Sequence, residues 1–265
     1  MSKLKLIAVF VVVLLFPVSC SSIAPVEVTH AKRAVIFIPG FKGSTLRDVE
    51  TNKTIWITAY QALFGSSSLR YSNTKLVPDG VLNRVDIIPG IYSLNVYQTF
   101  LESLQKRLSP DTLLVPFSYD WREDNFQHVL KLADLVRDLK SQGIDDISII
   151  AHSMGGLIAA YYLRYGNQAP ELAKEDWQGA KDIRAVVIVA TPFKGALLMF
   201  HDFLKGIKTL RNTSLLSAEA LQSFPSCYQL LPRHDTPIVL NEHLRTADVD
   251  FYNKKFWTKN YFTKY

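Results

Sequence analysis

The stretch that decides the fold is ISIIAHSMGGLIAAYYL, residues 147–163. Its first four residues predict a short buried strand, and the apolar run from Leu157 onward predicts a buried helix. Between the two, Ser153 is followed closely by two glycines, so the chain turns sharply with a serine at the apex. Such a turn needs small residues two before and two after the serine. Ala151 and Gly155 meet that need, with alanine where glycine is usual.

This turn lifts the Ser153 hydroxyl off the sheet, where it can act as a nucleophile. The backbone N–H of Met154 then faces the position where an oxyanion develops, and the helix that begins there adds its positive dipole end. The alternative is an ordinary strand–helix turn that happens to contain serine.

The composition predicts one globular domain with a large core. The chain has 265 residues, of which 48% are hydrophobic and 20% charged, and its 12 tyrosines, 15 phenylalanines and 4 tryptophans suit either apolar ligands or a large core. The formal charge is +6 without a basic stripe, so we predict no nucleic-acid partner and a mild attraction to anionic lipid. We predict no cofactor and no metal site.

The N-terminus predicts export. Lys3 and Lys5 precede an apolar run at 6–18, which is too short for a membrane span and typical of a signal peptide. The small residue before Cys20 resembles a bacterial lipoprotein signal, in which the cysteine is lipidated. We therefore predict a signal peptide at 1–19 and a cell-envelope protein that is lipid-anchored through Cys20. Ordinary secretion to the periplasm or beyond, or a buried N-terminal helix, are the alternatives.

The chain contains two cysteines, Cys20 and Cys227. Two cysteines do not make a disulfide framework. If Cys20 is lipidated, we predict that Cys227 is a lone thiol that serves as a small core residue.

Strand and helix patterns alternate along the chain. Continuous apolar runs predict parallel strands that are buried on both faces, at 34–38, 113–117, 147–150 and 185–190. Helical spacing predicts helices at 96–108 and 126–143, and a short strand is predicted at 85–88. The alternation predicts an α/β fold with a doubly wound, mostly parallel sheet, whose site lies at the carboxyl ends of the strands.

Two segments outside this alternation bear on the site. The loop PGFKGS at 39–44 follows the first strand and places Phe41 where a second oxyanion N–H is expected, unless it is an ordinary loop. The apolar and aromatic stretch at 54–69 predicts an insertion over the mouth of the site, with a surface helix as the alternative.

Several stretches resemble the lecithin:cholesterol acyltransferase family of α/β-hydrolases. They are VIFIPGFKGS at 35–44, IWI at 55–57, VDIIPGIYSL at 85–94, FSYDWR at 117–122, AHSMGG at 151–156, ATPFKGA at 190–196 and FPSCYQLLP at 224–232. The tetrapeptide YDWR is the most specific of these matches. The resemblance runs from about residue 35 to the end.

The resemblance implies a lipid acyl-ester hydrolase or O-acyltransferase that works through an acyl-enzyme intermediate. It implies Ser153 as the nucleophile, with Phe41 and Met154 as oxyanion donors. It also implies a lipid or acyl-ester substrate at a membrane surface, and leaves a protein partner open. The residues expected to shape and brace the site, with a buried Asp–Arg ion pair among them, are Trp56, Tyr119, Asp120, Trp121 and Arg122.

In this family the catalytic acid and histidine follow two further strands near the carboxyl terminus. After Ala190 this sequence has neither a glycine–aspartate turn nor a late histidine to match. We therefore interpret the chain as C-terminally truncated, with its final strands missing and its acid and base unknown. His243 with Asp248, and His234, are weak stand-ins; these two histidines and His201 are predicted to be solvated loop residues.

Three functions remain open on the sequence. They are the lipid acyl enzyme, a non-catalytic truncated relative that retains an acyl-binding groove, and a small-ester hydrolase. The predicted organisation is a tether at 20–33 and a hydrolase domain at 34–265, with a lid insertion at about 45–75 and a cap segment at about 196–265.

Overall fold

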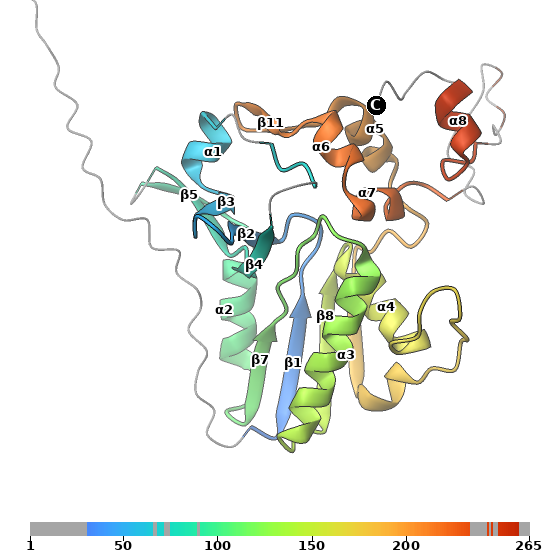
Figure 1. Ribbon diagram of the computed structural model, residues 1–265. Helices are drawn as coiled ribbons and strands as arrows, with labels where there is room; N and C mark the ends of the chain where they lie inside the picture. The colour runs from blue at the N-terminus through green and yellow to red at the C-terminus, as the bar shows by residue number, and fades with distance from the viewer. Residues whose placement is uncertain are drawn as a thin grey trace, which may run out of the picture.

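The computed structural model describes residues 31–65, 68–71, 75–88, 91–233, 243, 245 and 249–259, with the backbone alone at 258 and 259. The predicted signal peptide and Cys20 lie outside the described residues, as do His234 and Asp248. Figure 1 shows a sheet of parallel strands with helices on both faces and a further group of helices above the strand ends.

The central sheet has four parallel strands in the order β7-β1-β8-β9. Their bounds are β1 Arg33–Ile38, β7 Thr112–Pro116, β8 Asp146–His152 and β9 Ala185–Val189. Ile36 pairs with Ile149, and Ile38 with Ala151, so β1 and β8 end side by side. The predicted strands are all present, and the predicted α/β fold with a parallel sheet is confirmed.

Strand β1 sends alternate side chains into two cores, one on each face of the sheet. Ile36 packs in the larger core with helices α3 (Asn125–Ser141) and α4 (Gly155–Tyr165), whereas Phe37 packs in a smaller core with α2 (Gln98–Arg107). Helices therefore cover both faces of the strand, as Figure 1 shows. This is the doubly wound arrangement that the buried apolar runs predict.

Local signals set the ends of α3. The Asp124 carboxylate caps the helix by accepting a hydrogen bond from the Phe126 N–H at 2.8 Å. After its last turn, Gly143 has a φ of +82°, a conformation that glycine adopts without strain. The observed helix matches the one predicted at 126–143 to within two residues at each end.

Between β1 and α2 the chain forms two small antiparallel sheets, with strand orders β3-β2-β4 and β5-β6. Their elements, with one short helix, are β2 (Ser44–Asp48), β3 (Thr54–Trp56), α1 (Ala59–Leu63), β4 (Leu76–Val81), β5 (Arg84–Ile88) and β6 (Tyr92–Asn95). Only β5 matches a predicted strand. Strand β4 carries Pro78 and Gly80, residues that are depleted in strands, so its sequence favours a loop. The predicted lid boundaries stay a prediction.

The chain after β9 forms short elements above the sheet (Figure 1). They are α5 (Leu197–Lys205), β10 (Ile207–Thr209), β11 (Asn212–Leu216), α6 (Ala218–Gln222), α7 (Pro225–Gln229) and α8 (Lys254–Lys259), while a 3-10 turn, η1 (Gly179–Asp182), precedes β9. His201 lies in α5, so its prediction as a loop residue is wrong, although its side chain is 66% exposed. None of the helices in the described ranges is long and apolar enough to cross a membrane.

Strand β9 is the outer strand of the sheet and pairs with β8 alone among the described residues. Its side chains are largely exposed, at 39% for Val186, 54% for Val187 and 46% for Val189. The prediction that this strand is buried on both faces is therefore wrong for the part of the chain that the structure describes. The described strands that follow β9, β10 and β11, pair with each other and do not join the central sheet.

Candidate active site

Ser153 occupies a strained turn between β8 and α4. Its φ is +52°, in the left-handed region, which costs a non-glycine residue roughly 1–3 kcal/mol. Two hydrogen bonds hold this conformation: the Ser153 N–H donates to the Val189 carbonyl at 2.8 Å, and the Thr191 hydroxyl donates to the Ser153 carbonyl at 2.8 Å. The end of β9 therefore fixes the serine backbone on both sides.

The turn is packed too closely for larger neighbours. A Cβ added at Gly40 would lie 2.8 Å from the Ser153 Cβ, and one added at Gly155 would lie 2.7 Å from the Ile38 carbonyl oxygen. Ala151, two residues before the serine, is completely buried. These contacts explain why small residues are found at these positions. They also show that the end of β1 packs closely against the elbow.

The loop that follows β1 is braced by aromatic side chains that hold its backbone. Four hydrogen bonds do this: Tyr119 Oη to Pro39 O at 2.8 Å, Gly40 N to Tyr97 Oη at 3.0 Å, Trp56 Nε1 to Lys42 O at 3.1 Å and Trp121 Nε1 to Ser44 O at 3.0 Å. Because buried backbone polar groups are normally satisfied, these bonds fix the path of the loop. Of the four side chains, the sequence predicts Trp56, Tyr119 and Trp121 as site-shaping residues and misses Tyr97.

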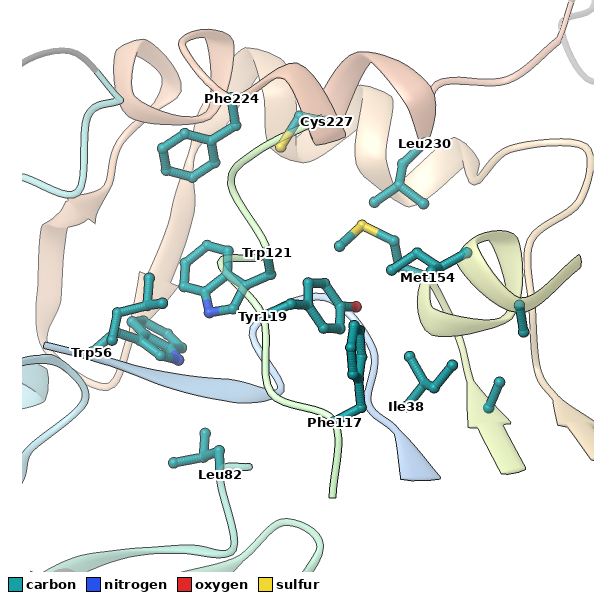
Figure 2. Packing of buried hydrophobic residues seen from close by; sticks show 14 of the residues in the cluster. Ile38, Trp56, Leu82, Phe117, Tyr119, Trp121, Met154, Phe224, Cys227 and Leu230 are labelled. Carbon is teal, nitrogen blue, oxygen red and sulfur yellow. The ribbon is translucent and has the colours of Figure 1, made fainter. Parts of the chain in front are cut away.

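Two backbone N–H groups remain available beside Ser153. Among the described residues, neither the Phe41 N–H nor the Met154 N–H donates a hydrogen bond. Met154 is the N-cap of α4, so its amide lies at the positive end of the helix dipole. Figure 2 shows the buried Met154 side chain beneath Leu230, at the contact between the elbow and the segment after α7. Met154 follows Ser153 in the chain, and Phe41 follows Gly40, which packs against Ser153, so two free donors near the serine can bind a developing oxyanion.

Asp120 and Arg122 form the buried ion pair that the sequence predicts. The Asp120 carboxylate accepts hydrogen bonds from Arg122 Nε at 2.9 Å and Nη2 at 2.6 Å, and both side chains are only 2% exposed. The guanidinium also donates to the Leu69 carbonyl at 3.1 Å and lies over the Tyr71 ring. The pair thus connects the chain that follows β7 to the segment at 68–71, and its predicted role as a brace for the site stays a prediction.

The model of the lecithin:cholesterol acyltransferase family matches residues 54–264 of this chain. The chain belongs to that family. The resemblance found in the sequence is therefore confirmed.

The chain is 26% identical over 239 residues to YJR098C, an uncharacterized protein of Saccharomyces cerevisiae, in a match that covers 84% of this chain and 32% of that protein. It thus spans about a third of the length of this curated relative.

Solved structures that are similar include the Tle4–Tli4 complex and the Bacillus licheniformis lipase BlEst2 in its mature form. The first has 13% sequence identity and a TM-score of 0.46, and covers 87% of this chain and 63% of its own chain. The second has 13% identity and a TM-score of 0.40, and covers 76% of this chain and 55% of its own.

In this protein, three described histidines make hydrogen-bond contacts with groups other than Ser153. His152 Nδ1 lies 2.7 Å from Tyr97 Oη, His128 Nε2 lies 2.8 Å from the Asp120 carbonyl, and His201 Nδ1 lies 3.2 Å from Asp202 Oδ1. Two of the weak stand-ins for the base and acid, His234 and Asp248, lie outside the described residues, and the role of the third, His243, stays untested. The family's acid and base are thus assigned to no residue here.

His128 is a buried histidine that the sequence analysis missed. It packs against the Tyr119 ring at 4.6 Å, and its Nδ1 has no hydrogen-bond partner among the described residues. Burial lowers the pKa of His128 to about 4, so the imidazole is neutral at pH 7 and donates to Asp120 through Nε2. Its spacing from Asp120 along the sequence gives no signal that the two meet. The histidine supports the Asp120 segment from α3.

Two further points concern the cysteine and possible metal ligands. Cys227 is fully buried, as predicted for a small core residue, and burial raises the pKa of its thiol. In the part of the chain that the structure describes, no cluster of three or more histidine, cysteine or carboxylate side chains is arranged to hold a metal ion.

Proposed function

We propose that this protein is a lipid acyl-ester hydrolase or O-acyltransferase that uses Ser153 as its nucleophile. The observation that carries the proposal is the strained serine at φ +52°, which is followed in the chain by Met154 and packs against Gly40, the residue before Phe41; the Met154 and Phe41 N–H groups have no acceptor among the described residues. Strain is retained at functional sites, and free donors beside a serine suit acyl transfer. Membership of the family supports the lipid substrate.

The proposed reaction has two halves. Ser153 Oγ attacks the ester carbonyl, its proton passes to a general base, and the carbonyl oxygen becomes an oxyanion between the two donors. The leaving alcohol departs with a proton from that base, which leaves the acyl group on the serine. Water then releases the acid, or an acceptor alcohol takes the acyl group. One oxyanion donor contributes about 10²–10³-fold to the rate in other serine enzymes.

A second candidate is a non-catalytic relative that retains an acyl-binding groove. It is favoured by the three described histidines whose hydrogen bonds go to groups other than Ser153. Without a general base, a serine enzyme retains only the small rate enhancement that comes from the oxyanion hole and substrate binding. This candidate predicts that acyl ligands bind but turn over slowly.

A fluorophosphonate probe and a series of acyl esters separate these candidates. The enzyme labels at Ser153, loses labelling in Ser153→Ala, and prefers long acyl chains. A preference for short esters indicates a small-ester hydrolase instead. Slow or absent labelling together with acyl-chain binding favours the non-catalytic relative, whereas brisk labelling that survives Ser153→Ala rejects the nucleophile assignment.

We also propose that the protein is held at the bacterial cell envelope by lipidation of Cys20. The support is the apolar run at 6–18 followed by a small residue and cysteine. In cells, Cys20→Ala is expected to release the protein from the membrane fraction and to abolish incorporation of labelled fatty acid. Labelling that persists in the variant contradicts the proposal.

A further inference from the structure

Tyr97 reaches two segments of the candidate site with one hydroxyl group. The residue lies just before α2, on the face of the sheet opposite α4. Its Oη accepts a hydrogen bond from the Gly40 N–H at 3.0 Å and lies 2.7 Å from His152 Nδ1. Edge-to-face packing of its ring on Phe37, with centroids 5.0 Å apart, sets the direction of the hydroxyl.

The hydrogen-bond roles in this bridge follow from the number of protons. The Gly40 N–H can only donate, so it occupies a lone pair of the Tyr97 hydroxyl. Among the described residues the phenol proton has no other acceptor, so we assign it to His152 Nδ1. The imidazole is then neutral and carries its proton on Nε2. Burial raises the pKa of Tyr97 and lowers the pKa of His152, and both shifts keep the pair neutral.

The two bridged segments each carry one oxyanion donor. Gly40 directly precedes Phe41 in the loop after β1, and His152 lies two residues before Met154 in the elbow. A Cβ added at Gly40 would approach His152 Nδ1 to 3.1 Å, so the segments touch here. No backbone hydrogen bond between these two segments is found among the described residues. The Tyr97 hydroxyl is therefore the polar link between them.

We propose that Tyr97 is a positioning residue that sets the separation of the two oxyanion donors by joining Gly40 to His152. The inference rests on the proposed function, because it concerns the hole that binds the oxyanion. When the hydroxyl is removed, the loop and the elbow remain packed but lose the hydrogen bonds that join Gly40 to His152 through Tyr97. Small misplacements at an active site reduce rates by up to about 100-fold.

The test compares Tyr97→Phe with Tyr161→Phe in the full chain in detergent. Tyr161 is a matched control, since its partly buried hydroxyl also donates one hydrogen bond, to the Gln168 carbonyl at 2.9 Å. Three quantities are measured: amide hydrogen exchange at Gly40, whose N–H donates to Tyr97 Oη, the His152 tautomer by ¹⁵N NMR, and the rate of fluorophosphonate labelling at Ser153. For Tyr97→Phe we expect faster exchange, a mixed tautomer and labelling roughly 10- to 100-fold slower, with none of these in the control.

Any other result rejects the bridge, the positioning role or the proposed function. Unchanged exchange and tautomer in Tyr97→Phe reject the bridge, and altered exchange with unchanged labelling rejects the positioning role. A wild-type chain that does not label rejects the proposed function, and the positioning role with it, while the exchange and tautomer data still decide the bridge. If Tyr97→Phe fails to fold, His152→Asn and His152→Ala replace it. Asparagine retains an acceptor near Nδ1, so it must label faster than alanine, and equal rates overturn the proposal.

Discussion

Strands β1 and β9 flank the same strand, β8, and both have continuous apolar sequences, but their surroundings differ (Figure 1). Ile36 and Ile38 of β1 are completely buried, whereas Val187 of β9 is 54% exposed in the described part of the protein. An apolar run therefore predicts a strand more safely than it predicts burial. Burial depends on which elements are present to cover the strand.

The difference matters for the site because both flanks hold Ser153. On the β1 side, Gly40 of the loop after β1 packs closely against the serine. On the β9 side, Val189 and Thr191 hold the serine backbone by hydrogen bonds. One support of the candidate nucleophile thus belongs to a well-packed core, and the other to an exposed edge.

The largest expected contrast comes from truncating one side chain on each flank. Ile36→Ala removes fully buried atoms and is expected to lower the free energy of unfolding by about 2–5 kcal/mol. Val187→Ala removes exposed atoms and is expected to change it by less than about 0.5 kcal/mol. Urea unfolding of the two variants measures both effects. A comparable loss in Val187→Ala means that β9 is covered in solution.

Acid is expected to weaken the buried flank. Burial lowers the pKa of His128 to about 4, below its ordinary value of 6.5. The unfolded chain therefore takes up this proton at higher pH than the folded chain, and stability falls as the pH drops from about 6.5 to about 4. The gap corresponds to about 3 kcal/mol. Urea unfolding across this range measures the slope, and His128→Gln is expected to reduce it. Parallel slopes in the two proteins contradict the assignment.

A smaller effect is expected where β9 holds the serine. Thr191→Val preserves the shape of the side chain but removes the hydroxyl that donates to the Ser153 carbonyl. The expected loss of stability is about 1 kcal/mol, with slower fluorophosphonate labelling of Ser153. Thr209→Val in β10 serves as the control. If the two valine variants label equally fast, the β9 end does not support the serine conformation.

The smallest effect on stability is expected at the open edge itself. An unpaired apolar edge promotes aggregation, and lysine is a residue that natural edge strands use against it. We expect residues 20–265 to aggregate, and Val187→Lys to reduce light scattering while unfolding at a free energy within about 0.5 kcal/mol of wild type. A strongly destabilised lysine variant indicates instead that another segment or partner covers β9.

The parallel strands, the elbow and helix α3 could be predicted because their signals are local. Apolar runs, helical spacing and the small residues around Ser153 all lie within one element or turn. The sheet formed by β2, β3 and β4 could not be predicted. Pro78 and Gly80 weaken the strand signal of β4, and this strand forms by pairing with β2, a segment distant in the sequence.

The sequence by itself determined the order of strands and helices, the place of Ser153 at a tight turn and the family, because these depend on short-range patterns and recurring motifs. Only the tertiary structure decided the burial of His128, the exposure of β9 and the hydrogen bond from the Gly40 N–H to Tyr97, the one aromatic brace that the sequence missed. The Tyr97–His152 contact shows the reason, since it joins residues 55 positions apart. Such contacts depend on how elements pack, and no local pattern encodes that packing.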